Sequence, residues 1–163
     1  MTRITVAFFS PDATAHHSTR DVAKLIQEIT DADSYEIKPA EPYNEEDLDW
    51  EDKTSRSSME MADSKSRPEL ADKNATFEDY DIIYLGFPIW WYVAPHIINT
   101  FLETYDFSGK TIVTFATSGG SSWGDTLKYL KPSSPNAKFI EGKVFRGTIN
   151  KDTLTEWIKT IDF

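Results

Sequence analysis

A hydroxyl-rich segment follows the first apolar run of the chain. The run Ile4 to Phe9 is typical of a strand, and Ser10, Ser18 and Thr19 come soon after it. A helical pattern begins at about Thr19, and the free N–H groups at a helix N-terminus favour a bound phosphate. Hydroxyl side chains at such positions also cap helices and form turns. The segment therefore fits either a phosphate site or an ordinary helix start.

An aromatic segment follows a second apolar run, Ile82 to Leu85. It contains Pro88, Ile89, Trp90, Trp91 and Tyr92. Adjacent strand residues point to opposite faces, so two neighbouring tryptophans cannot both enter one core from a strand. In a loop, one indole can cover a flat ligand by stacking while the other packs inward. A hydrophobic cluster beneath the loop accounts for the same residues equally well.

A glycine pair follows a third apolar run, Lys110 to Phe115. The segment reads Thr117-Ser118-Gly119-Gly120. Paired glycines let the backbone approach a ligand closely and adopt positive φ, and their N–H groups can bond the polar edge of a ring system. Gly-Gly turns also occur in loops that bind nothing, so on its own this segment favours neither interpretation.

The three segments share one topological property, because each directly follows a strand. Strands alternate with helical patterns, and the strands are near-continuous apolar runs, as in sheets covered on both faces. We therefore predict an α/β fold: a three-layer, doubly wound, five-stranded parallel sheet of order 2-1-3-4-5, in a single domain over residues 1–163. In such sheets ligands bind outside the carboxyl ends of the strands, near the point where strand order reverses. The three segments are thus expected to meet in one crevice.

The remaining elements are expected from periodicity. Strands are predicted at 35–38 and within 137–146, and helices are predicted to start near residues 19, 95, 121 and 150. The connection 39–76 is polar, acidic and long for a compact domain, and we expect it to hold some helix.

Charge and composition exclude several function classes. The chain has 17 Lys and Arg against 27 Asp and Glu, a net charge of −10, and such a chain repels nucleic acid and anionic lipid. The same charge attracts basic protein surfaces, or it serves solubility alone. The chain has no cysteine, which excludes disulfides, thiolate metal sites and iron–sulfur clusters.

Motifs for other chemistry are missing from the sequence. It has no Walker loop and no G-x-G-x-x-G after the first strand. His16, His17 and His96 have no supporting carboxylate pattern, so we predict no metal site and no catalytic acid or base. The uncharged stretch 82–102 is interrupted by Gly86 and by prolines, and no secretory signal is visible. We expect a cytoplasmic protein without membrane insertion.

Four segments together resemble the flavodoxin-like FMN proteins of bacteria. They are Tyr80 to Trp91, Asn99 to Glu103, Asp106 to Thr111 and Thr117 to Ser121, and Arg67 to Leu70 in the long connection resembles the family as well. The resemblance implies a three-layer fold, noncovalent FMN and transfer of one or two electrons. It runs in detail from about residue 67 to residue 121 and is weak elsewhere.

The resemblance also implies roles for single residues. Ser10 matches the first hydroxyl of the family's phosphate loop, and Thr19 matches the threonine that closes this loop. Pro88 to Trp91 match the loop beside the isoalloxazine, and Thr117 to Gly120 match the loop at the edge of the ring.

Two features depart from the family pattern. The family's phosphate loop reads S-x-T-G-N-T, whereas Ser10 to Thr19 spans nine steps, with His17 and Ser18 in place of glycine and asparagine. Arg20 follows in the first helical turn, where its charge either supports a phosphate or points into solvent. Tyr92 stands where many relatives have a small residue.

We expect an FMN electron carrier that meets redox partner proteins with basic docking surfaces, as a monomer or weak homodimer. A carrier needs no catalytic acid or base, because the flavin does the chemistry. The first alternative is an FMN-dependent NAD(P)H or quinone oxidoreductase, which requires open space beside the flavin for a second planar substrate. The second alternative is a flavin-free interaction domain on the same fold, and the altered phosphate loop motivates it.

Overall fold

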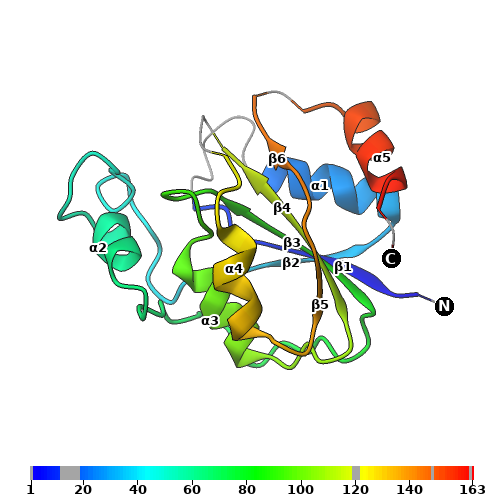
Figure 1. Cartoon of the computed structure of the whole chain (residues 1–163), viewed down its shortest axis with the longest axis horizontal. Helices are drawn as coiled ribbons and strands as arrows, with labels where there is room; N and C mark the ends of the chain where they lie inside the picture. The colour runs from blue at the N-terminus through cyan, green and yellow to red at the C-terminus, as the bar shows by residue number, and fades with distance from the viewer. Residues whose placement is uncertain (1, 12–18, 119–121, 148, 162) are drawn as a thin grey trace.

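A parallel sheet forms the centre of the molecule (Figure 1). The computed structural model describes residues 2–11, 19–118, 122–147, 149–161 and 163. Its strands are β1 (Ile4–Phe8), β2 (Asp33–Glu36), β3 (Ile82–Pro88), β4 (Thr111–Thr117), β5 (Lys138–Ile140) and β6 (Val144–Phe145). The strand order is β2-β1-β3-β4-β5 with parallel pairing, and β6 pairs with β4 beyond β5. The predicted fold class and strand order are confirmed.

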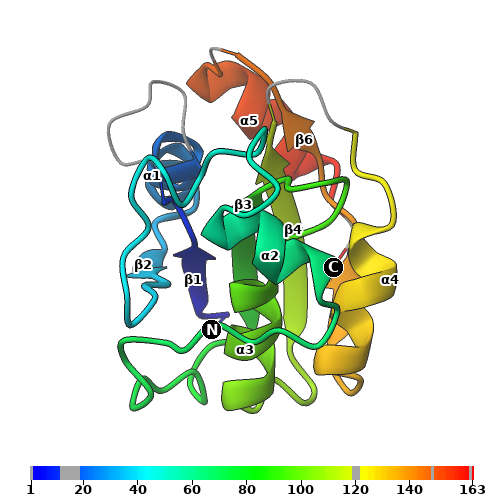
Figure 2. The same ribbon diagram turned by 90° about the vertical axis from the view of Figure 1, so that its left-hand side faces the viewer.

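Helices cover both faces of this sheet. They are α1 (Thr19–Thr30), α2 (Arg56–Ala62), α3 (His96–Thr104), α4 (Thr126–Leu130) and α5 (Lys151–Lys159), and the 3-10 helix η1 (Lys131–Ser133) follows α4. α1 and α5 pack together on one face, and α3 and α4 lie on the other (Figures 1 and 2). α2 stands apart, beyond the carboxyl ends of β3 and β4 (Figure 1). None of the described helices is long and apolar enough to cross a membrane.

Alternation along the strands supplies two separate cores. In β3, Ile83, Leu85 and Phe87 pack with α3, whereas Ile82 and Tyr84 pack with α1 and α5. Successive strand residues point to opposite faces, so a strand covered on both sides must be apolar throughout. This requirement explains the continuous apolar runs of the sequence, while the backbone pairing register aligns β1, β3 and β4.

The last strand of the predicted sheet is divided in two by a contact at Gly142. The Thr114 hydroxyl donates to the Ile140 carbonyl at 3.0 Å and accepts from the Gly142 N–H at 3.3 Å. A Cβ on Gly142 would lie 1.5 Å from the Thr114 carbonyl oxygen, so no other residue fits there. The sequence predicted one strand within 137–146, and β5 and β6 are its two halves.

The long acidic connection between β2 and β3 contains α2, as expected. The Ser55 hydroxyl caps α2 by accepting from the Ser58 N–H at 3.3 Å. The Arg56 guanidinium lies 3.8 Å from the centre of the Tyr43 ring and pairs with Glu60 at 3.1 Å. Tyr43 donates to the same carboxylate at 2.5 Å, and burial with this bond raises the tyrosine pKa. These contacts join α2 to Tyr43 within the connection, and the Tyr43 ring packs edge-to-face against Phe9, with 5.8 Å between the ring centres.

Candidate functional site

The carboxyl ends of β1, β3 and β4 lie side by side. The Phe9 N–H donates to the Gly86 carbonyl at 2.9 Å, and the Ile89 N–H donates to the Thr117 carbonyl at 3.0 Å. Pro88, the last residue of β3, is paired in register with Thr117, and Ile89 is buried. The three loops that follow these strands therefore start from one edge of the sheet (Figure 1).

Hydroxyl groups of the first and third loops touch each other. Thr19 Oγ1 and Thr117 Oγ1 are 2.7 Å apart, and both side chains are buried. Ser10 Oγ accepts a hydrogen bond from the Arg20 N–H at 3.3 Å, at the first turn of α1. Hydroxyl groups and a helix N-terminus thus share a small region, which suits a phosphate group. Four further predicted site residues lie outside the described part of the chain: His17, Ser18, Gly119 and Gly120. Ser118 begins the third loop, and its N–H donates to the carbonyl of Phe145 at 3.1 Å.

The Arg20 side chain turns toward β2. Its guanidinium forms two hydrogen bonds with the Glu36 carboxylate, at 3.0 and 2.8 Å, and lies 5.4 Å from the centre of the Phe8 ring. The hydrogen bonding with Glu36 raises the pKa of Arg20. The side chain is thus held by a carboxylate, instead of pointing freely into solvent or toward a phosphate. Only the backbone N–H of Arg20 faces the first loop.

The aromatic segment ends in a tight turn of unusual backbone conformation. Trp90 and Val93 exchange two backbone hydrogen bonds, at 2.9 and 3.1 Å, around Trp91 and Tyr92. Trp91 has a φ of 49° and Tyr92 a φ of 65°, in the left-handed region that side chains disfavour. Turns of this hand normally carry Asn or Gly. Such strain costs on the order of 1–3 kcal/mol per residue and is found mainly at ligand sites.

The two tryptophans of this segment have different environments. Trp90 is partly buried and packs edge-to-face against Phe9, at 5.8 Å between ring centres, and against Tyr43, at 5.6 Å. Trp91 is 43% exposed and Tyr92 is 58% exposed. The structure therefore combines both interpretations of the sequence: one indole joins a hydrophobic cluster, and the other is free to cover a ligand.

Trp123, in the third loop, has an unpaired polar group. Its Nε1 is buried and has no hydrogen-bond partner among the residues that the structure describes. Its ring lies against Phe87, with 6.1 Å between the ring centres. A buried donor without a partner costs about 1–3 kcal/mol, so this N–H is available to an acceptor such as a ligand oxygen. Nothing in the sequence pattern distinguishes Trp123 from an ordinary core tryptophan. Only the structure shows that its Nε1 lacks a hydrogen-bond acceptor within the described part of the chain.

The polar groups of this site are hydroxyls, backbone N–H groups and one indole N–H. Within the described ranges, no group of three or more acidic or histidine side chains could hold a metal ion. Donors of this kind bind and orient an anionic, ring-bearing ligand. The arrangement therefore fits a phosphate-bearing flavin whose ring supplies the reactivity.

Comparison with known proteins decides the family. A family model described as flavodoxin matches residues 3–161. The chain belongs to the flavodoxin family. No curated protein matches it.

Two solved structures are similar to this chain, in sequence and in fold, over nearly its whole length. A Bacteroides uniformis protein, provisionally described as a flavoprotein, has 48% identity and a TM-score of 0.89, covering 98% of this chain and 99% of its own. A second such protein, from Bacteroides eggerthii, has 40% identity and a TM-score of 0.87, covering 99% and 98%. A more distant flavoprotein, from Lactobacillus acidophilus, was crystallised with FMN. It has 21% identity and a TM-score of 0.67, covers 97% of this chain and 99% of its own, and shares the fold.

Proposed function

We propose that this chain binds one FMN noncovalently at the carboxyl edge of its sheet and carries electrons through it. The observation that carries the proposal is the 2.7 Å contact between Thr19 and Thr117, which joins the first and third loops beside the aromatic turn. Family membership and the shared fold of the FMN-bound Lactobacillus acidophilus protein support the choice of flavin. When bound, FMN supplies one- or two-electron chemistry that no side chain of the site can supply.

The phosphate end has candidate ligands on the first loop. Ser10, Thr19 and the first N–H groups of α1 would hold it, together with His17 and Ser18. A helix N-terminus binds a dianion through several backbone donors and its dipole, without a full positive charge. A phosphate can therefore bind here without the Arg20 side chain, whose guanidinium is hydrogen-bonded to Glu36.

The ring end has candidate ligands on the second and third loops. The turn Pro88 to Tyr92 would cover one face of the isoalloxazine, with Trp91 exposed and Trp90 packed beneath. Thr117 to Gly120 would face the polar edge of the ring. The unpaired Nε1 of Trp123 supplies a further donor for a ring carbonyl in this part of the molecule.

The visible spectrum of the purified protein tests flavin binding. We expect flavin absorption bands, with flavin fluorescence strongly quenched because an indole lies against the ring. A colourless protein that also fails to take up added FMN would reject the proposal and favour a flavin-free interaction domain. Steady-state oxidation of NAD(P)H by the flavin-loaded protein then separates the two flavin functions. A carrier shows almost none without a reductase, whereas an oxidoreductase turns over.

We further propose that a cytoplasmic redox partner with a basic surface docks beside the aromatic turn. Trp50, which is 69% exposed, lines one hollow together with Glu51 and Trp91. This hollow belongs to a chain with a net charge of −10, which attracts positively charged surfaces. Electron transfer with a basic partner should slow as salt rises, since charges are screened beyond about 8 Å at physiological ionic strength. Rates independent of salt would place the docking face elsewhere.

A further inference from the structure

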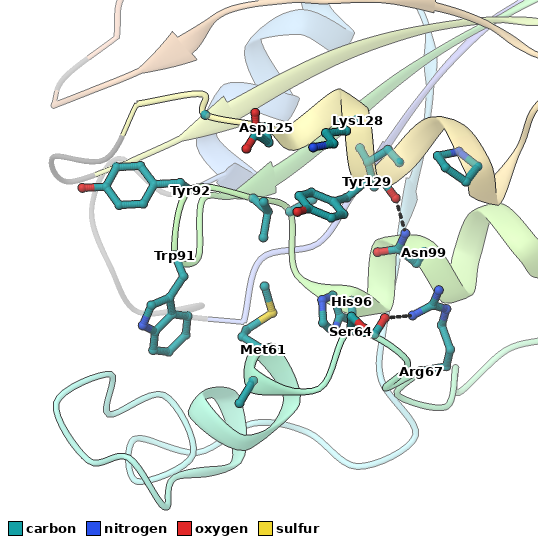
Figure 3. A pocket seen from close by; sticks show the side chains of 16 residues that line it. Met61, Ser64, Arg67, Trp91, Tyr92, His96, Asn99, Asp125, Lys128 and Tyr129 are labelled. Carbon is teal, nitrogen blue, oxygen red and sulfur yellow. Dashed lines mark hydrogen bonds between the residues drawn. The ribbon is translucent and has the colours of Figure 1, made fainter.

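A second cavity, separate from the proposed flavin site, lies against the turn of Trp91 and Tyr92. It has a volume of about 780 Å³ and is enclosed by α2, α3, α4 and the turn of Trp91 and Tyr92 (Figure 3). Neither Ser10 nor Thr19 nor Thr117 lines it. Its size falls in the usual range of sites for small molecules, about 300–1,000 Å³.

A contact between two loops forms part of the boundary of this cavity. Gly124 has a φ of 58°, and a Cβ there would lie 2.4 Å from the Tyr92 carbonyl oxygen. The loops after β3 and β4 therefore touch at this point, and only glycine allows it. The cavity and the proposed flavin site share the aromatic turn as a wall.

His96, at the start of α3, lines the cavity with a fixed tautomer. The Ser66 hydroxyl donates to the Glu60 carbonyl at 2.7 Å, which uses its single hydrogen. The His96 Nδ1 lies 2.6 Å from the same Ser66 oxygen, so Nδ1 must carry the proton and donate to Ser66. In the neutral ring, Nε2 is then a bare acceptor, and among the described residues it has no hydrogen-bond partner.

The surroundings of His96 favour this neutral ring. Burial lowers its pKa from the ordinary value, and the positive charge of Arg67 lowers the pKa further. Hydrogen bonding with the Glu60 backbone and the acidic side chains of Glu60 and Asp63 act in the opposite direction but do not reverse the shift. At neutral pH the ring of His96, which lines the cavity, therefore carries a hydrogen-bond acceptor at Nε2 rather than a second donor.

The remaining walls of the cavity consist of aromatic rings and a methionine side chain. Met61 of α2 and the ring of Tyr129 of α4 point into it, with Trp91 on the side away from His96 (Figure 3). Aromatic rings and a thioether sulfur pack well against a planar ring. Arg67, Lys128 and Asp125 also line the cavity, and Arg67 is paired with Glu103 at 3.1 Å, so charges of both signs surround the ligand position.

We propose that this cavity binds a planar aromatic molecule of the phenol class, whose ring hydroxyl donates to Nε2 of His96. A bare acceptor selects a ligand with a donor, and the walls select a flat ring. The site does not depend on FMN being bound. It gives the molecule a second ligand position that shares Trp91 and Tyr92 with the first.

Calorimetric titration with two matched probes tests the proposal. The probes are 2-naphthol, which can donate a hydrogen bond, and 2-methoxynaphthalene, which cannot. The whole protein is used as purified, with its flavin if it carries one. We expect 2-naphthol to bind about tenfold more tightly, because the methoxy compound leaves the acceptor unpaired in the cavity.

The variant His96→Asn isolates the acceptor. Asparagine keeps an N–H near the position of Nδ1 for the bond to Ser66 but places no acceptor at the position of Nε2. We expect it to remove the preference for 2-naphthol, while Lys24→Gln, at a separate surface hollow beside β2, leaves the preference intact. Equal binding of the two probes by the unaltered protein, or a preference that survives in His96→Asn, would overturn the proposal.

The ¹⁵N resonances of the His96 ring give a second readout that needs no variant. We expect a protonated Nδ1 and a bare Nε2 in the free protein, and a shift of the Nε2 resonance when 2-naphthol is added. A protonated Nε2 at neutral pH, or no shift on saturation, would refute the site even if His96→Asn fails to fold. A protein that fails to take up added FMN but passes both tests would reject the flavin proposal and leave this one standing.

Discussion

The loops after β1 and β3 start from the same edge of the sheet but carry opposite kinds of side chain. After β1, Ser10 and Thr19 are small, buried and engaged in hydrogen bonds. After β3, Trp91 and Tyr92 are large, exposed and held in a left-handed backbone. The first loop can hold a ligand by directed hydrogen bonds, whereas the second can only cover it. The difference teaches that anchoring and covering are separable, and substitutions should affect them separately.

The largest effect should distinguish the two adjacent tryptophans. Trp90→Ala removes ring contacts with Phe9 and Tyr43, so we expect the free energy of unfolding to fall by about 3 kcal/mol. Trp91→Ala removes an exposed ring, and its effect on unfolding should stay within about 0.5 kcal/mol. It should instead weaken FMN binding and raise the reduction potential, because an aromatic face penalises added negative charge on the flavin. Denaturant unfolding and flavin titration of both variants check this, and similar stability losses in both would show that Trp91 belongs to the core.

The second effect concerns anchoring at the first loop. Thr19→Val keeps the shape of the side chain but removes the hydroxyl that contacts Thr117. A hydrogen bond to a charged group is worth about 1.5–3 kcal/mol, so we expect FMN affinity to fall by roughly ten- to a hundredfold. Thr30→Val makes the same change at the far end of α1, where the hydroxyl bonds only the Ile26 carbonyl, and should leave FMN affinity unchanged. Equal effects of the two substitutions would remove Thr19 from the site.

The smallest effect isolates the strain in the turn. Tyr92→Ala and Tyr92→Gly both remove the ring, but only glycine accepts a φ of 65° without strain. We therefore expect the glycine variant to be more stable than the alanine variant by about 1 kcal/mol, with a similar loss of flavin affinity in both. Thermal unfolding of the two proteins measures the difference. If alanine is as stable as glycine, the turn is not strained in solution.

The sequence predicted most elements well because periodicity is a local signal, but the helix predicted to start near residue 121 begins only at Thr126. The apolar spacing of Val22, Ile26 and Ile29 predicts α1, and Asn150 caps α5 by accepting from the Thr153 N–H at 2.8 Å, as its position suggested. Continuous apolar strands then required helices on both faces, and this led to the strand order. Short-range patterns were sufficient for the fold.

The site was less predictable because it depends on contacts between residues far apart in the sequence. The amino-acid sequence does not distinguish Trp90 from Trp91, because Trp90 is partly buried through its contacts with Phe9 and Tyr43, which are distant in the sequence. The left-handed turn runs against the preference of aromatic residues, so no propensity could indicate it. The tautomer of His96 depends on Ser66, which lies thirty residues earlier in the long connection.

The central claim is that the first loop still anchors a phosphate despite its unusual length. The most direct measurement compares the affinities of the flavin-free protein for FMN and for riboflavin, which lacks the phosphate. Several charge-assisted hydrogen bonds should favour FMN by at least about a hundredfold. Equal affinity for the two flavins would contradict the account, because the first loop would then contribute nothing to binding.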